Sequence, residues 1–161
     1  MLKKFRIVEG RVIESDETNA EIMVYVSPDE SQKSYLVNTL NIDEHTLNSS
    51  LDPDELSRLE FEPEHMAMIF KRAKDHFLTD DFLFRVTSVG LFAFKDKLVV
   101  VLSDNINIFE GKQFIRIQTI KDIVIRLLYR SIFHYLEHLK LINLASDDLE
   151  KKTNIAIDNK Y

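Results

Sequence analysis

The chain has 161 residues, of which 45% are apolar and 30% are charged, the balance of an ordinary soluble globular domain. It contains no cysteine, which excludes disulfides, zinc fingers and thiol nucleophiles. The net charge of −6 argues against a nucleic-acid partner. No apolar run approaches the roughly 20 residues that span a bilayer, so we expect one soluble domain.

Short runs of apolar and β-branched residues predict a sheet. The expected strands are residues 5–13, 20–26, 66–73, 82–87, 90–94 and 98–102, with a short edge segment at 114–117. The tight connection from Phe94 to Leu98 predicts a hairpin between the last two runs.

Three helix starts are predicted from capping residues. Ser27-Pro28-Asp29-Glu30 combines an N-cap, a proline at the first helical position and an acid three residues after the cap, which predicts a helix to about residue 40. Asp43 is expected to cap a second helix that ends near Leu47. Asp52-Pro53-Asp54-Glu55 repeats the first start signal and predicts a third helix.

From Thr119 the spacing of apolar residues changes to three- and four-residue steps, which predicts a long amphipathic helix. It could extend to Lys152, about 33 residues or roughly 50 Å. Strands followed by a long terminal helix, with short helices inserted early, predict a layered α/β or α+β domain.

Residues 48–70 raise the question of a metal site, because they hold six acids and a histidine. These are Asp52, Asp54, Glu55, Glu60, Glu62, Glu64 and His65. Acids also gather at helix starts, where they accept backbone N–H groups and complement the helix dipole. We favour capping for Asp52, Asp54 and Glu55, and keep metal binding by these three as the alternative.

The sequence His134-Tyr135-Leu136-Glu137-His138 matches the H-x-x-E-H pattern of inverted zinc proteases. His134 and His138 could ligate zinc and Glu137 could act as general base, so a small zinc metallohydrolase is one alternative function. That site needs a third protein ligand. We expect both histidines on a solvated face with Arg126 and Arg130, opposite the apolar stripe.

The order of segments resembles that of CorA-type magnesium transporters. The similar stretches are LNIDEHTLNSSLDPDELSRLEFEPEHMAMIFK, the hairpin SVGLFAFKDKLVVVLSD and the helix YRSIFHYLEHLKLINLASDDLEKK. The resemblance extends from about residue 5 to 152, and the matching order carries more weight than any one motif.

The resemblance implies an α/β/α sandwich with a mixed β-sheet and a long C-terminal helix. Residues 1–152 would form the cytosolic regulatory domain of a CorA-like transporter of magnesium or another divalent metal ion, and residues 153–161 would begin the connection to the stalk. Its partners would be its own stalk and transmembrane helices, in a homopentamer at the cytoplasmic face of the cell membrane. The domain itself would not be an enzyme.

In the family, intracellular Mg²⁺ bound between subunits holds the pore closed. The resemblance places the sensing aspartate of the family at Ser49, so Asp52, Asp54 and Glu55 are the nearest acids that could replace it. Hard oxygen ligands suit Mg²⁺, and Co²⁺, Ni²⁺ or Zn²⁺ are alternative ions. A soluble interaction domain without metal function is the remaining alternative.

Overall fold

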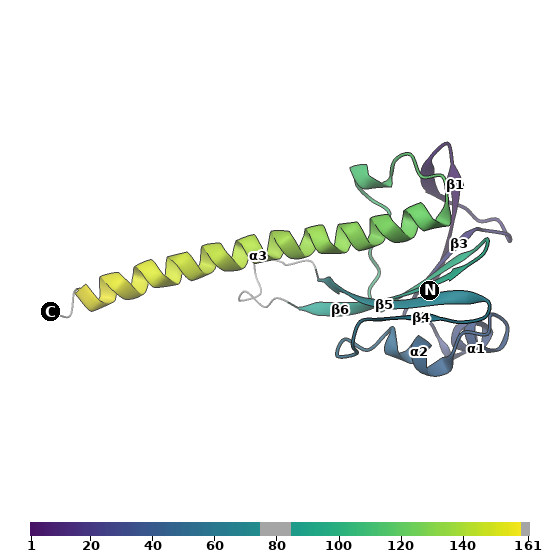
Figure 1. Ribbon diagram of the computed structural model, residues 1–161, viewed down its shortest axis with the longest axis horizontal. Helices are drawn as coiled ribbons and strands as arrows, with labels where there is room; N and C mark the ends of the chain where they lie inside the picture. The colour runs from purple at the N-terminus through teal and green to yellow at the C-terminus, as the bar shows by residue number, and fades with distance from the viewer. Residues whose placement is uncertain (75–84, 159–161) are drawn as a thin grey trace.

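The computed structural model describes residues 1–74 and 85–158 (Figure 1). Its elements are β1 Leu2–Val8, β2 Arg11–Glu14, β3 Ile22–Val26, α1 Glu30–Asn38, α2 Glu44–Ser49, β4 Arg58–Phe61, β5 His65–Ala73, β6 Val86–Phe94, β7 Leu98–Leu102, the 3₁₀ helix η1 Lys112–Phe114 and α3 Ile120–Asp158. The strands form one sheet in the order β2-β1-β3-β7-β6-β5-β4. Because β3 and β7 are parallel and the other neighbours antiparallel, the predicted mixed sheet is confirmed.

The sheet lies between two helical layers, with α1 and α2 on one face and α3 on the other (Figure 1). In the central strand β7, Leu98, Val100 and Leu102 pack toward α3. Val99 and Val101 pack toward α1 and α2. A strand buried on both faces has a continuous run of apolar residues, and the run Leu98–Leu102 predicted β7 for this reason. The expected α/β/α sandwich is therefore confirmed.

Helix α3 was predicted correctly, and it ends at Asp158 rather than Lys152. Its start is capped reciprocally: the Thr119 N–H donates to Asp122 Oδ2 at 2.8 Å, and the Asp122 N–H donates to Thr119 Oγ1 at 3.2 Å. Its N-terminal part packs on the sheet, where Ser131 Oγ donates to the Lys71 carbonyl at 2.8 Å. Its C-terminal part extends beyond the sheet (Figure 1).

The single strand predicted over residues 5–13 is wrong, because this segment is a hairpin of β1 and β2. Val8 pairs with Arg11, so Glu9 and Gly10 form a two-residue turn, with φ of 48° and 75°. Positive φ at both positions suits the right-handed twist of a hairpin. The alternation of residues continues through this turn, so the sequence pattern alone did not indicate the turn.

The first predicted helix exists, but its predicted start at Ser27 is wrong. Ser27 has a φ of 41°, and the N-cap is Asp29, whose carboxylate accepts the Gln32 N–H at 2.8 Å. Gln32 Oε1 accepts the Asp29 N–H at 3.2 Å, which completes a capping box two residues later than expected. The second helix is confirmed, with Asp43 as its cap.

The strands predicted at 20–26, 66–73 and 98–102 agree with β3, β5 and β7. The separation predicted between the runs at 82–87 and 90–94 is wrong, because β6 continues from Val86 to Phe94 without a break. The hairpin between β6 and β7 is confirmed by a hydrogen bond from the Phe94 N–H to the Lys97 carbonyl at 2.8 Å. Strand β6 begins at Val86; residues 82–84 of the run predicted over 82–87 lie outside the described residues. The edge strand predicted at 114–117 is wrong: it is replaced by η1 and one bridge between Arg11 and Ile115. No described helix is long and apolar enough to cross a membrane.

Candidate functional site

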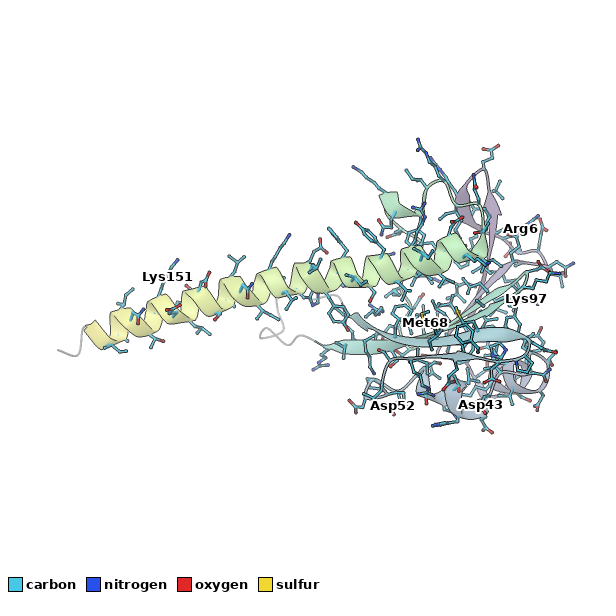
Figure 2. The ribbon with its side chains drawn as sticks, in the orientation of Figure 1. Arg6, Asp43, Asp52, Met68, Lys97 and Lys151 are labelled. Carbon is cyan, nitrogen blue, oxygen red and sulfur yellow. The ribbon has the colours of Figure 1, made fainter. Side chains whose placement is uncertain are left out.

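The acidic segment that raised the question of a metal site forms the connection from α2 to β4. The third helix predicted there is wrong. Asp52 caps no helix; its Oδ1 accepts the N–H of Asp54 at 2.8 Å, which closes an Asx turn. The helix N-cap predicted at Asp52 is therefore wrong, and its carboxylate closes a turn. The side chains of Asp52 and Asp54 are exposed (Asp52 is labelled in Figure 2).

The backbone of this turn is fixed to the sheet. Lys71 Nζ, on β5, donates to the Pro53 carbonyl at 2.5 Å and to Ser88 Oγ at 2.9 Å. The Ser88 hydroxyl, on β6, donates in turn to the Asp52 carbonyl. A lysine and a serine from two strands therefore hold a loop whose carboxylates point outward.

The end of α2 is packed unusually closely against β6. Ser50 is fully buried, and its hydroxyl donates to the Leu47 carbonyl at 2.6 Å. A Cβ atom built on Gly90 would lie 2.5 Å from Ser50 Cβ and 2.9 Å from Ser50 Oγ. Glycine is needed here for the close approach, because any other side chain would collide with the end of α2.

Beside this contact, Glu55 joins the loop to α2 and β4. The Ser49 hydroxyl donates to Glu55 Oε2 at 2.9 Å, and Arg58 Nη1 donates to Glu55 Oε1 at 2.8 Å. The hydrogen bond from Ser49, with help from the Leu56 N–H and the charge of Arg58, lowers the pKa of Glu55. Ser49 is buried, so the position that the resemblance gives to a sensing acid holds a hydroxyl that binds a neighbouring acid.

Arg58 extends the network to the start of α2. Its Nε donates to Glu60 Oε1 at 2.8 Å, and Glu60 Oε2 lies 3.1 Å from Thr46 Oγ1. That hydroxyl is also 3.0 Å from Asp43 Oδ2. The pKa of Asp43 is lowered mainly by the backbone N–H of Thr46. One connected polar network therefore lies along α2, formed by the side chains of Ser49, Glu55, Arg58, Glu60, Thr46 and Asp43.

The network does not bring the three predicted metal ligands together. Asp52 is occupied by its own turn, Asp54 points into solvent, and Glu55 is paired with Arg58. Within residues 1–74 and 85–158, no three acidic or histidine side chains are grouped so that they could hold a metal ion.

His65, the histidine of the acidic segment, is separate from this network. It is buried, with its ring centroid 5.9 Å from that of Phe92 and 4.8 Å from that of Phe94. Burial lowers its pKa, against a smaller opposite effect of Glu62 and Glu64. A buried imidazole in contact with two aromatic rings is a core residue.

The expected solvated face of the H-x-x-E-H motif is wrong. His138 is buried with 7% of its surface exposed, His134 is half-buried, and their ring centroids are 4.5 Å apart. These positions lie about two and three helical turns after Leu127, so they continue the face that packs on the sheet. Glu137 is exposed on another side of α3, and the described residues offer no third ligand for zinc.

A scan against protein-family models and a search of curated proteins found no match. Among solved structures, the soluble domain of CorA from Methanocaldococcus jannaschii superposes with a TM-score of 0.69 and 19% sequence identity over 94% of this chain. This chain has the fold of the CorA soluble domain. The complete CorA magnesium transporter from the same organism gives a TM-score of 0.66 at 17% identity over 94% of the chain.

The full-length CmaX protein has the same fold, with a TM-score of 0.63 at 12% identity over 93% of the chain. The chain spans 63% of the CorA soluble domain, 50% of complete CorA and 49% of CmaX. The resemblance noted in the sequence is therefore supported at the level of the fold, with a CorA-like N-terminal domain as the matching part.

Proposed function

We propose that this chain is the cytosolic regulatory domain of a CorA-like transporter of Mg²⁺ or another divalent metal ion. The observation that supports it most is the superposition on the CorA soluble domain over 94% of the chain. Segment order in the sequence points the same way. In this proposal the domain performs no catalysis, and it works at the cytoplasmic face of the membrane within a homopentamer that its stalk and transmembrane helices hold together.

Metal sensing in this proposal depends on Glu55 more than on Asp52 or Asp54. Glu55 is the carboxylate bound to Ser49, the position at which the resemblance places the sensing acid. Its second oxygen is paired with Arg58, which must move away before Glu55 could bind a cation. Mg²⁺ gives up its water reluctantly and prefers several converging oxygens. Binding by this chain is therefore weak.

A calorimetric titration tests this point. The chain is expected to show no saturable Mg²⁺ site below about 1 mM, which corresponds to roughly −4.1 kcal/mol. Arg58→Gln frees the carboxylate and is expected to tighten Mg²⁺ binding, and adding Glu55→Gln should remove the gain. Asp54→Asn is the matched control, because Asp54 is exposed and outside the network. A micromolar site lost in Asp52→Ala or Asp54→Ala would instead place metal binding in the turn.

The proposal that the chain belongs to a transporter is tested by sequencing the gene and by assaying its full-length product. The coding sequence beyond Tyr161 must supply two apolar segments of about 20 residues, and a stop codon at that point would refute the proposal. The whole product, reconstituted in vesicles with a Mg²⁺-sensitive dye, is expected to transport Mg²⁺ more slowly when Mg²⁺ is high on the cytosolic side. Loss of that inhibition on removal of residues 1–152 would support a regulatory role, and its persistence would contradict one.

A further inference from the structure

A cavity of about 310 Å³ lies where α3, the sheet and the loop between β7 and η1 meet. Part of its lining is apolar and buried, including Val89 on β6 and Leu127 on α3. Its mouth is polar, because the exposed Asn105 and Asn107 of the loop also belong to the lining. Ligand sites in proteins are concave and mostly apolar, with a few polar groups that orient the ligand, and they have volumes from roughly 300 Å³. The cavity therefore has the size and the composition of a small-molecule site.

Two arginines line this cavity, one from the sheet and one from the helix. Arg72 on β5 has only 12% of its side chain exposed, and it pairs with Asp104 at 3.2 Å. Arg130 on α3 is half-buried, and its Nη1 donates to the carbonyls of Asn107 at 2.9 Å and Glu110 at 3.3 Å. A guanidinium has five N–H groups on three nitrogens. In the described part of the chain, Nε and Nη2 of Arg130 make no hydrogen bond, so Arg130 holds the loop with one nitrogen and keeps two for a ligand.

The charge around the cavity is positive, although the whole chain carries a net charge of −6. Asp104 is shared between two cations, because it pairs with Lys74 at 3.1 Å as well as with Arg72. Glu110 is the acid among the described lining residues, and it is exposed. These two acids oppose three cations, since Arg130 adds to Arg72 and Lys74. One positive charge is therefore left uncompensated beside a partly buried cavity, where a charge is less screened than on an open surface.

We propose that this cavity binds a small phosphorylated organic molecule, with its phosphate between Arg72 and Arg130 and its apolar part against Val89 and Leu127. The planar fork of an arginine matches the oxygens of a phosphate, and its charge persists at any physiological pH. The ligand supplies the negative charge that the cavity lacks. His134 lines the same cavity, so the site also gives this histidine of the H-x-x-E-H motif a place in a binding wall rather than in a zinc centre.

A ligand in this cavity would touch the sheet, the loop and α3 at once. These three parts are joined at the cavity by few polar contacts, among them those of Arg130 with the loop and that of Ser131 with β5. Binding to the folded chain alone raises its stability. The ligand would therefore fasten α3 and the loop to the sheet. This site does not depend on the transporter proposal.

Binding is tested on the 161-residue chain by NMR titration with phenyl phosphate, which joins one phosphate to one apolar ring. It is expected to bind with a dissociation constant of about 1 mM or lower, and to shift the amide signals of β5, the loop and α3 beside the cavity. Inorganic phosphate and phenol each carry only one of the two parts, so each is expected to bind at least tenfold more weakly. Absence of saturable phenyl phosphate binding, or equal binding of inorganic phosphate, would overturn the proposal.

Two arginines on α3 give a matched pair of variants. Arg126 and Arg130 are both half-buried, and Nη1 of Arg126 also donates to a loop carbonyl, that of Gln113. Only Arg130 lines the cavity. Arg130→Gln is expected to raise the dissociation constant of phenyl phosphate at least tenfold, because a charge-assisted hydrogen bond is lost, and Arg126→Gln less than twofold. Equal effects of the two variants would show a general effect of positive charge and refute the site.

A third variant fills the cavity without changing its charge. Ile106 lines the cavity and is half-buried, so a larger side chain there would occupy the space of the ligand. Ile106→Trp is expected to raise the dissociation constant of phenyl phosphate at least tenfold with an unchanged circular dichroism spectrum. A folded Ile106→Trp variant that binds phenyl phosphate as tightly as the unchanged chain would place the ligand outside the cavity and contradict the proposal. If this variant does not fold, the comparison of Arg130→Gln with Arg126→Gln decides.

Discussion

Replacing Gly90 with alanine is expected to destabilise the fold through one contact. The added Cβ would lie 2.5 Å from Ser50 Cβ and 3.2 Å from Phe92 Cε2, and both neighbours are fully buried. Overpacking of this kind costs about 1–3 kcal/mol. Moving Ser50 also weakens its 2.6 Å hydrogen bond to the Leu47 carbonyl, worth about 1 kcal/mol. Reduced entropy of the unfolded chain returns about 0.4–1 kcal/mol. A net loss of about 2 kcal/mol is expected in a urea melt.

The contact itself is isolated by a double-mutant cycle with Ser50→Gly. That substitution removes the two nearest atoms, Cβ and Oγ of Ser50, and leaves only the 3.2 Å contact with Phe92. The double variant should therefore be more stable than the sum of the two single effects by at least 1 kcal/mol. Additive effects within about 0.5 kcal/mol would refute the collision between Ser50 and Gly90. A Gly90→Ala variant as stable as the unchanged chain would refute the close packing of α2 on β6 altogether.

Two further predictions concern buried histidines. Burial lowers the pKa of His65 in the folded state, so the unfolded chain binds more protons near neutrality; stability should fall as the pH falls through about 6.5, the unfolded value, and His65→Gln should reduce this slope in melts from pH 7.5 to 5.5. A slope unchanged in His65→Gln would contradict the assignment. Replacing His134 and His138 together with alanine should cost about 2 kcal/mol or more in a denaturant melt, because His138 is buried and lies on the same side of α3 as the buried Leu127 and Ser131. A change below about 0.5 kcal/mol would contradict the burial of this side of the helix.

The sequence predicted the layers of the fold because burial on both faces leaves a strong pattern in β3 and β7. It failed where backbone conformation changes without a change of pattern. Glu9 adopts a positive φ, which glutamate rarely does, so nothing in the sequence indicated the β1–β2 turn and the segment was predicted as one strand. Ser27 likewise precedes a proline as an N-cap would, yet its φ of 41° is not that of an N-cap, and Asp29 caps the helix.

The candidate site could be predicted only in part, for a related reason. Glu55 and Arg58 are three residues apart, a spacing at which they would pair in a helix as they do in this loop. Their pairing was therefore compatible with the third helix predicted from Asp52, which does not form. The bond from Ser49 to Glu55 and the anchoring of the turn by Lys71 and Ser88 join separate segments, and no local pattern specifies them.

Helix α3 carries apolar residues on two opposite faces, and the spacing of these residues in the sequence already indicates both. Leu127, Ser131, His134 and His138 repeat at three- and four-residue steps on one face, and the exposed Ile125, Tyr129, Ile132, Leu136 and Leu139 do so on the opposite face. Treating these as one apolar face placed the histidines in solvent. A helix with two apolar faces is stable when both are buried. In the part of the chain that the structure describes, the sheet covers one of these faces and the other is exposed.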